Sequence, residues 1–173
     1  MASNIEIKAV VDEPAALGER VAAIATDGPY VIEQHDTFFR CSNGRLKLRR
    51  FGDGSGELIF YRRADSTGPA FCQYERTAAA DPDGLLRVLQ QANGVRGEVI
   101  KTRTLYLAGR TRIHMDAVEG LGDFMELEVV LGEGESTVQG ELDAERLMAA
   151  LGVTQSDLIE RAYIDLIEAR SAG

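Results

Sequence analysis

GRTRIHMDAVEGLGDFMELEVVL, residues 109–131, alternates ionisable and apolar side chains on both sides of a glycine turn. Successive side chains of an extended strand point to opposite faces, so residues two apart share one face. The ionisable residues that share a face are Arg112, His114 and Asp116 before the turn, and Glu126 and Glu128 after it. The stretch therefore predicts two strands, each with one charged face and one apolar face.

The same alternation recurs along the rest of the chain. Further strands are expected over residues 4–10, 30–40, 44–50, 57–63, 70–77 and 99–107. Their charged faces carry Glu6, Lys8, Lys47, Arg49, Arg62, Lys101 and Arg103. The chain has three lysines, and all three lie at such positions instead of being scattered as solubilising residues. This placement calls for a ligand with many negative charges.

Seven or eight short strands, with helices between groups of them, indicate an α+β fold built on a largely antiparallel sheet. A sheet face this densely basic would be unusual in contact with bulk water. Two like charges about 4 Å apart repel by about 4 kcal/mol at an effective dielectric near 20, so converging cations need an anion. We therefore expect a closed or nearly closed antiparallel β-barrel, a tunnel lined by the charged faces, with flanking helices over the apolar faces.

Helix start and stop residues predict where those helices lie. The expected helices run from Asp12 to the turn at 27–29, from Asp81 to Asn93, from Asp143 to Gly152, and from Thr154 through Leu166. The second should turn Leu85, Leu86 and Leu89 toward a core. A turn is expected over residues 64–69.

Composition limits the class of protein. A chain of 173 residues, 45% of them hydrophobic, suits one domain over residues 1–173. The net charge of −9, with no basic run, argues against nucleic acid as a partner. Cys41 and Cys72 have no metal-binding spacing, and we expect them to be core thiols in a reducing compartment. The charged N-terminal residues argue against a signal peptide, and no apolar run suits a membrane span, so we expect a cytoplasmic protein.

Carboxylates among so many bases suggest that a divalent cation bridges them to an anion. Glu126 and Glu128 offer hard oxygen ligands, which favour Mg²⁺ or Mn²⁺. The alternative for any one strand is a half-solvated sheet with salt bridges between neighbouring strands. This alternative is less favoured for the whole chain, because the spacing of two recurs on several strands. His114 alone is more often a hydrogen-bonding spacer than a metal ligand or base.

These motifs resemble the CYTH family, which groups class IV adenylyl cyclases with thiamine triphosphatases and other triphosphate hydrolases. NIEIKA, residues 4–9, resembles the family's N-terminal ExExK motif, and GRLKLRR, ELIFYRR, VIKTRTLYL and the 109–131 stretch follow in the family's order. The resemblance covers nearly the whole chain. It implies a tunnel of eight antiparallel strands that binds a triphosphate through basic side chains, with acidic residues that hold divalent cations.

The resemblance also implies a role for each matching residue. The phosphate-binding positions are Lys8, Lys47, Arg49, Arg62, Arg76, Lys101, Arg103 and Arg112, with Lys8 and Arg103 as catalytic residues. The metal ligands are Glu6, Asp116, Glu126 and Glu128. Asn4 departs from the motif, because it offers a neutral oxygen where the family has its first glutamate. A second metal ion would then be held more weakly, or one ion would suffice.

The implied reaction is cleavage of a small-molecule triphosphate, and the sequence leaves open which group attacks. The leading hypothesis is a class IV adenylyl cyclase-like enzyme that converts ATP to cyclic AMP and pyrophosphate. The alternatives are a hydrolase of thiamine triphosphate or inorganic tripolyphosphate, and a non-catalytic module that binds polyphosphate or nucleotide. A homodimer stays open, since nothing in the sequence gives the oligomeric state.

Overall fold

The structure is a computed structural model that describes residues 1–64, 66 and 68–173. Its strands are β1 (Ala2–Val10), β2 (Asp27–Phe39), β3 (Arg45–Phe51), β4 (Gly56–Arg63), β5 (Ala70–Ala79), β6 (Val95–Ala108), β7 (Thr111–Val118) and β8 (Gly122–Val130). Its helices are α1 (Pro14–Ile24), α2 (Pro82–Asn93), α3 (Thr137–Leu151) and α4 (Tyr163–Ser171), with a short 3₁₀ helix, η1 (Gln155–Asp157).

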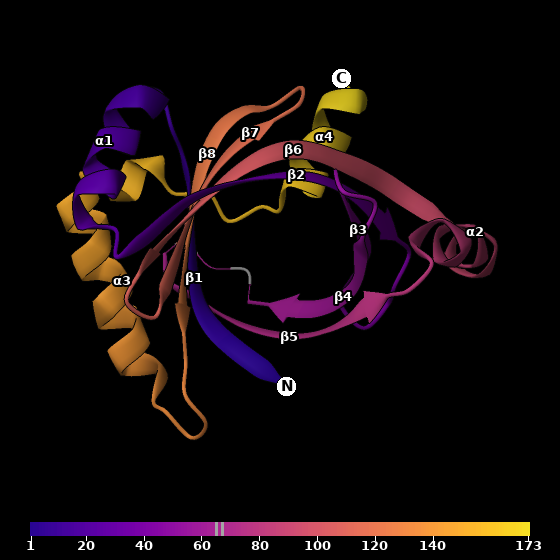
Figure 1. The fold of residues 1–173 in the computed structure, drawn as a ribbon, viewed down its shortest axis with the longest axis horizontal. Helices are drawn as coiled ribbons and strands as arrows, with labels where there is room; N and C mark the ends of the chain where they lie inside the picture. The colour runs from indigo at the N-terminus through magenta and orange to yellow at the C-terminus, as the bar shows by residue number, and fades with distance from the viewer. Residues whose placement is uncertain (65, 67) are drawn as a thin grey trace.

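The eight strands of these described residues close into an antiparallel barrel in the order β1-β5-β4-β3-β2-β6-β7-β8. β1 pairs with β5 on one side and with β8 on the other, which closes the ring. Figure 1 looks into the barrel, with β2 and β6 above the opening and β4 and β5 below it. The predicted tunnel of eight antiparallel strands, with flanking helices, is confirmed.

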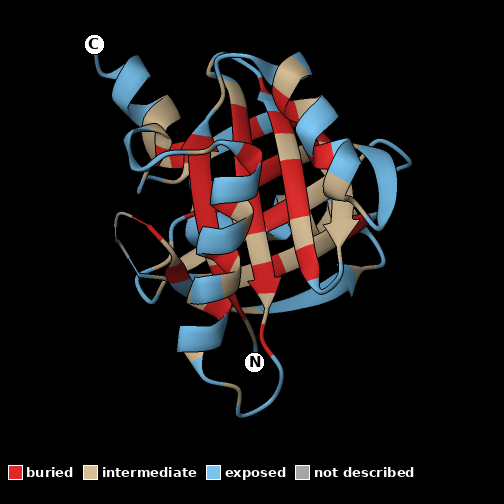
Figure 2. Cartoon of the chain, turned by 90° about the vertical axis from the view of Figure 1, so that its left-hand side faces the viewer, coloured by how far each residue is buried: buried red, intermediate tan, exposed pale blue. Residues whose placement is uncertain are grey.

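The main hydrophobic core lies outside the barrel, between its wall and two helices. The apolar faces of β1 and β8, with Ile7 and Leu127 fully buried, pack under α1 and α3. Figure 2 shows these buried strands behind the helices that cover them. Gly140 permits the close approach of α3, because a Cβ there would come within 2.7 Å of Ile5 Cγ1 and of Leu131 Cδ2. The period-two alternation therefore leaves the charged faces of these strands for the interior.

The segment that leads into α4 crosses one end of the barrel. The backbone N–H of Ile159 donates to the carbonyl of Lys8 at 3.0 Å, and Arg63 Nη1 donates to the carbonyl of Glu160 at 2.7 Å. Tyr163, the first residue of α4, is 5% exposed and lines the interior. We refer to this end as the closed end and to the other as the open mouth.

The helices differ in detail from the sequence prediction. α1 starts at Pro14 after Glu13, so Asp12 is not its cap. Asp81 does cap α2, since Asp81 Oδ1 accepts from the Gly84 N–H at 2.9 Å. Among the described residues, however, α2 has no buried side chain, so the prediction that its leucines reach a core is wrong.

The C-terminal helices begin at other residues than predicted. Ser136 caps α3, seven residues before the expected cap Asp143, and Gly152 ends it at φ 70° as expected. Asp143 lies inside α3 and binds Arg110 instead. The last predicted helix is interrupted, because Leu158 forms a β-bridge with β1 and α4 starts only after it. No helix among the described residues is both long and apolar enough to cross a membrane. The turn predicted over 64–69 includes Asp65 and Thr67, which lie outside the described residues.

Candidate functional site

The barrel encloses a cavity of about 270 Å³. Most of the ionisable residues singled out in the sequence line it, although they come from six different strands. The predicted residues that line it are Glu6, Lys8, Lys47, Arg49, Arg76, Lys101, Arg103, Arg112, Glu126 and Glu128. The alternation of charged and apolar residues therefore does bring these side chains into one lumen.

Arg62 is the exception among the predicted cations. Its Nε donates to the carbonyl of Asn43 at 2.8 Å, and its guanidinium lies 5.3 Å from the centre of the Phe60 ring on the outer face. Arg63 occupies the lumen in its place, with Nε 2.8 Å from Glu6 Oε2. The sequence analysis therefore assigned the wrong one of two adjacent arginines to the inner face of β4. Apolar and aromatic residues of β4, such as Tyr61, face the lumen together with Arg63, so polarity alone does not identify the inner face.

Asp116 organises the cations near the closed end. It accepts hydrogen bonds from Arg103 Nε at 2.7 Å, Arg103 Nη2 at 2.6 Å, Lys101 Nζ at 3.0 Å and the Tyr163 hydroxyl at 3.0 Å. Burial would raise the pKa of the Asp116 carboxyl, but Arg103 and Lys101 outweigh it and hold this pKa far below its ordinary value. These donors use the lone-pair sites of the carboxylate. The predicted role of Asp116 as a metal ligand therefore does not fit, and its place fits positioning of the two cations.

Glu126 continues this network toward the first strand. Its Oε1 lies 3.1 Å from Lys8 Nζ, and its Oε2 accepts from Arg103 Nη2 at 2.6 Å. Despite burial, Lys8 and Arg103 hold the pKa of Glu126 well below its ordinary value, so the carboxylate is ionised. Lys8 also lies 4.2 Å from the centre of the Tyr163 ring. Both residues assigned as catalytic, Lys8 and Arg103, thus meet at one carboxylate.

A second carboxylate, on the strand beside β6, holds the cations of β3. Asp36 on β2 is 1% exposed. Arg49 donates to both of its oxygens at 2.8 Å, and Lys47 donates to Oδ2 at 2.8 Å. The sequence analysis missed Asp36. Asp36 lies within the strand expected over residues 30–40, but its direct pairing with Arg49 follows only from the β2–β3 register.

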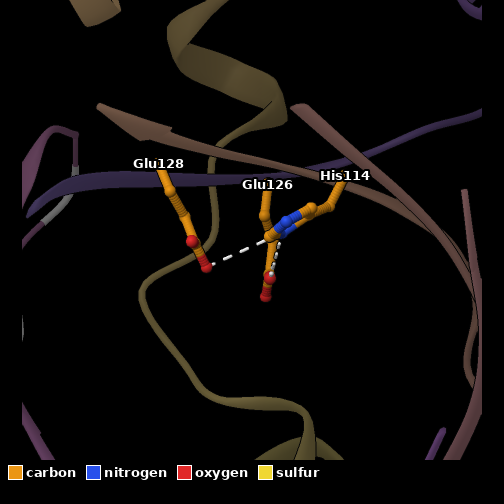
Figure 3. Close-up of side chains that lie close together, drawn as sticks. All are labelled: His114, Glu126 and Glu128. Atoms are coloured by element: carbon orange, nitrogen blue, oxygen red, sulfur yellow. Dashed lines mark ion pairs between the residues drawn. The ribbon is translucent and has the colours of Figure 1, made fainter. Parts of the chain in front are cut away.

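His114, Glu126 and Glu128 form a cluster that could hold a cation. One ligand atom from each lies within 4.8 Å of the others. Figure 3 shows the His114 ring facing both carboxylates, with Nδ1 3.6 Å from Glu126 Oε2 and 3.6 Å from Glu128 Oε1. These distances are too long for hydrogen bonds. Within the described part of the chain, Nδ1 has no hydrogen-bond partner although His114 is buried.

The protonation states suit a cation at this cluster. Burial and the positive charge of Arg103 lower the pKa of His114, so its imidazole is neutral and can ligate. Despite burial, Arg112 and Arg103 lower the pKa of Glu128. Asn4 Oδ1, on the same face of β1 as Glu6, is another buried oxygen without a partner among the described residues. The donor set therefore fits a divalent cation, and His114 fits a ligand better than the spacer expected from sequence.

Glu6 and Arg112 lie beside this cluster. Glu6 is opposite Glu128 in the β1–β8 register, but its carboxylate faces Arg63. Burial and the neighbouring Glu126 raise the pKa of Glu6. Arg112 Nε donates to Glu128 at 2.8 Å.

Arg76 and the two cysteines lie in different surroundings. Arg76 lies 3.7 Å from Glu57 with a side chain 57% exposed, which places it near solvent. Cys72 is buried and lines the lumen, where burial raises the pKa of its thiol to about 12. Cys41 is only partly buried, so the expectation of a core thiol fails there.

Known proteins share this fold and this sequence pattern. The family model described as the CYTH domain matches residues 2–163. PH1012 protein from Pyrococcus horikoshii OT3 has a similar structure with a TM-score of 0.85 and 23% identity, covering 94% of this chain and 98% of that chain. No curated protein matches the chain.

Two further structures carry names that mention activities. A proposed adenylate cyclase from Vibrio parahaemolyticus aligns with a TM-score of 0.78 and 18% identity, covering 95% of this chain and 97% of that chain. HpAC1 from Hippeastrum, a proposed adenylyl cyclase with a dominant triphosphatase activity, aligns with a TM-score of 0.65 and 17% identity, covering 99% and 96%.

Proposed function

The chain belongs to the CYTH domain family, and from that premise we propose that it is a divalent-metal-dependent enzyme that cleaves small-molecule triphosphates. The observation that carries the proposal is the meeting of two cation clusters, each built on one buried carboxylate, in a single lumen. Asp116 orders Lys101 and Arg103 of β6, and Asp36 orders Lys47 and Arg49 of β3, two strands further round the barrel. A chain of phosphates along this part of the lumen would meet preorganised donors from both clusters.

The charge of the lumen supports a metal ion as part of the site. The cations around it are Lys8, Arg45, Lys47, Arg49, Arg63, Arg76, Lys101, Arg103 and Arg112, against the carboxylates Glu6, Asp36, Glu57, Asp116, Glu126 and Glu128. This small positive excess cannot neutralise a triphosphate, which carries about four negative charges. Mg²⁺ or Mn²⁺ held by Glu126, Glu128 and His114 would supply the missing charge neutralisation at the phosphoryl oxygens.

Lys8 and Arg103 would act on the phosphoryl group that faces the metal ligands. Both contact Glu126, so both lie at the border between the cation cluster and the ligand cluster. Their donors can then stabilise negative charge that develops on the transferred or leaving phosphate. Arg49, Lys47, Lys101 and Arg112 would position the remaining phosphates.

The leading reaction is that of a class IV adenylyl cyclase, in which the ribose hydroxyl of ATP attacks the α-phosphorus. A triphosphate that enters from the open mouth with its phosphate end first places the α-phosphate in the outer half of the lumen. On β7, His114 lies one lumen position further from the closed end than Asp116. The ligand cluster would therefore lie near the α- and β-phosphates, where pyrophosphate departs.

Hydrolysis is the second candidate. HpAC1, which shares the fold at 17% identity, has a dominant triphosphatase activity. The same cations would serve attack by water on the terminal phosphorus, so the lining does not discriminate between the two reactions.

Product analysis separates these functions. Purified protein is incubated with ATP, thiamine triphosphate and tripolyphosphate, each with Mg²⁺ or Mn²⁺. Cyclic AMP with pyrophosphate supports the cyclase, and phosphate without cyclic AMP supports the hydrolase. Tight binding without turnover in either metal would support a non-catalytic module. An Arg103→Met variant should lose turnover, whereas Arg62→Met, on the outer face, should keep it.

A further inference from the structure

Three neighbouring strands each change from polar to apolar on the way to the open mouth. Counted from the closed end, the lumen positions of β3 end with Lys47, Arg49 and then Phe51. Those of β6 end with Lys101, Arg103 and then Leu105, and those of β2 end with Asp36, Gln34 and then Ile32. β3, β2 and β6 are adjacent in the barrel. On this side of the open mouth, an apolar residue therefore follows the last cation of β3 and the last cation of β6.

This apolar patch, formed by Ile32, Phe51 and Leu105, does not suit a bare polyphosphate. An inorganic chain would gain nothing from contact with it, and binding there would remove water from phosphate oxygens without a donor in exchange. A flat organic group attached to the triphosphate would bury apolar area against the patch and could stack on the Phe51 ring. The patch thus favours a triphosphate that carries an organic moiety.

Gln34 lies beside Phe51 with an unused polar group. Its side chain is 5% exposed and lines the lumen. Its Oε1 has no hydrogen-bond partner within the residues that the structure describes. Gln34 is paired directly with Phe51 across the β2–β3 ladder. Leaving a buried amide oxygen unpaired is costly, so a ligand that donates to it gains affinity and specificity.

From these observations we infer that Gln34 and Phe51 form a subsite for the organic part of the triphosphate, and that this part is a heteroaromatic ring carrying an amino group beside a ring nitrogen. A glutamine amide pairs with such an edge through two hydrogen bonds, with Oε1 as acceptor and Nε2 as donor. The adenine of ATP and the aminopyrimidine of thiamine triphosphate both present this edge. The inference rests on the proposed function and adds the substrate class to it.

Calorimetric binding measurements test the subsite. The probes are ATP, purine riboside triphosphate, which lacks the amino group, thiamine triphosphate, and inorganic tripolyphosphate. The wild-type protein should bind ATP or thiamine triphosphate more tightly than purine riboside triphosphate and tripolyphosphate. Gln34→Leu should weaken binding of the preferred amino compound about tenfold and leave tripolyphosphate within about twofold. The compound that loses affinity identifies which of the two rings the subsite takes.

Two further variants serve as controls. Phe51→Leu keeps the apolar volume and removes the ring, so it should weaken the organic triphosphates and not tripolyphosphate, even where Gln34→Leu does not fold. Gln73→Leu makes the same chemical change at a position of β5 that does not line the cavity, and should change nothing.

The outcomes separate the subsite from the proposed function. Equal affinities of the wild-type protein for tripolyphosphate and the organic compounds, or equal losses for all probes in Gln34→Leu, would overturn the subsite and leave the proposed function standing. No binding of any of the four probes would overturn both.

Discussion

Arg49 donates two hydrogen bonds of 2.8 Å to the two carboxylate oxygens of Asp36, a bidentate pair inside the barrel. Asp36 is 1% exposed, so the pair is out of contact with bulk water. Charge-assisted bonds of this geometry are strong, and breaking a buried pair by removing one partner is strongly destabilising. Lys47 and Arg49 are therefore held in place before any ligand binds.

Asp36→Asn should destabilise the ligand-free protein by about 3 kcal/mol, because Lys47 and Arg49 lose their counter-charge. Tripolyphosphate should replace the missing charge, so it should raise the melting temperature of the variant by more than that of the wild type. Thermal unfolding with and without tripolyphosphate measures both effects. Asp83→Asn removes a carboxylate that is 75% exposed near Arg50 and should change stability by less than about 0.5 kcal/mol. Equal ligand-induced shifts in Asp36→Asn and the wild type would contradict this interpretation.

Lys47 should make triphosphate binding depend on pH. Burial and the neighbouring Arg49 lower the pKa of Lys47 from 10.5 to about 8. Between these values the unfolded chain binds more protons than the folded one, so the Lys47 contribution to stability rises with pH. A bound polyanion favours the charged lysine, so the affinity for tripolyphosphate should fall by up to about tenfold per pH unit above pH 8.

The Lys47→Arg variant isolates this effect, because arginine stays charged over the whole range. Calorimetric titrations with tripolyphosphate from pH 7 to pH 9.5 give the affinities, and buffers of different ionisation enthalpy give the protons taken up. The wild type should show more proton uptake than Lys47→Arg above pH 8. Identical pH profiles in the two proteins would remove Lys47 as the titrating group. The ionisation of tripolyphosphate itself is the same for both proteins, so it cancels in the comparison.

The fold was predictable because the charged and apolar faces alternate with a strict period of two on most strands. In β1, β7 and β8 the outer residues pack under helices, so polarity and orientation agree. In β4 this agreement fails, since Tyr61 faces the lumen and Arg62 does not. A strand that carries apolar residues on both faces gives no phase from polarity, and adjacent arginines then cannot be told apart. The pairing of β4 with Lys47 on β3 and Arg76 on β5 decides which β4 residues face the lumen, and only the structure supplies this pairing.

The candidate site was predictable in its cations and less so in its carboxylates. Glu126 and Glu128 follow from the two-residue spacing, and they lie together as expected. The partner of each carboxylate does not follow from spacing, because Asp116 and Asp36 are held by cations from other strands. Tyr163 could not be placed either, since its contact with Asp116 depends on how the C-terminal segment crosses the barrel end.

Asn4→Glu should strengthen binding of a divalent cation. Asn4 is buried on the same face as Glu6, and the resemblance of this strand to the ExExK motif places a glutamate there in the family. A further carboxylate adds an anionic oxygen ligand, so Mn²⁺ affinity should rise by about tenfold. In the chelated protein the new charge lies near Glu6 and lacks a partner, so the melting temperature should fall.

Titration of the protein with Mn²⁺ alone measures the affinity, and unfolding in chelator measures the cost. Asn43→Glu places the same charge on an exposed loop and should change neither value. An Mn²⁺ affinity that is unchanged in Asn4→Glu would show that the cation lies away from this end of β1.

Arg62 and Arg63 offer a matched pair, because they are adjacent in sequence and lie on opposite faces of β4. The Arg63 side chain is 5% exposed and pairs with Glu6, whose pKa is already raised by burial. Arg63→Met leaves the Glu6 carboxylate buried without this cation, so the free energy of unfolding at neutral pH should be about 3 kcal/mol lower than in the wild type. Arg62 is exposed, with one bond to a loop carbonyl, and Arg62→Met should stay within about 0.5 kcal/mol of the wild type. Urea unfolding compares the two variants directly, and tripolyphosphate affinity should fall in Arg63→Met alone. A larger loss in Arg62→Met than in Arg63→Met would mean that the phase of β4 is the reverse, with Arg62 in the lumen.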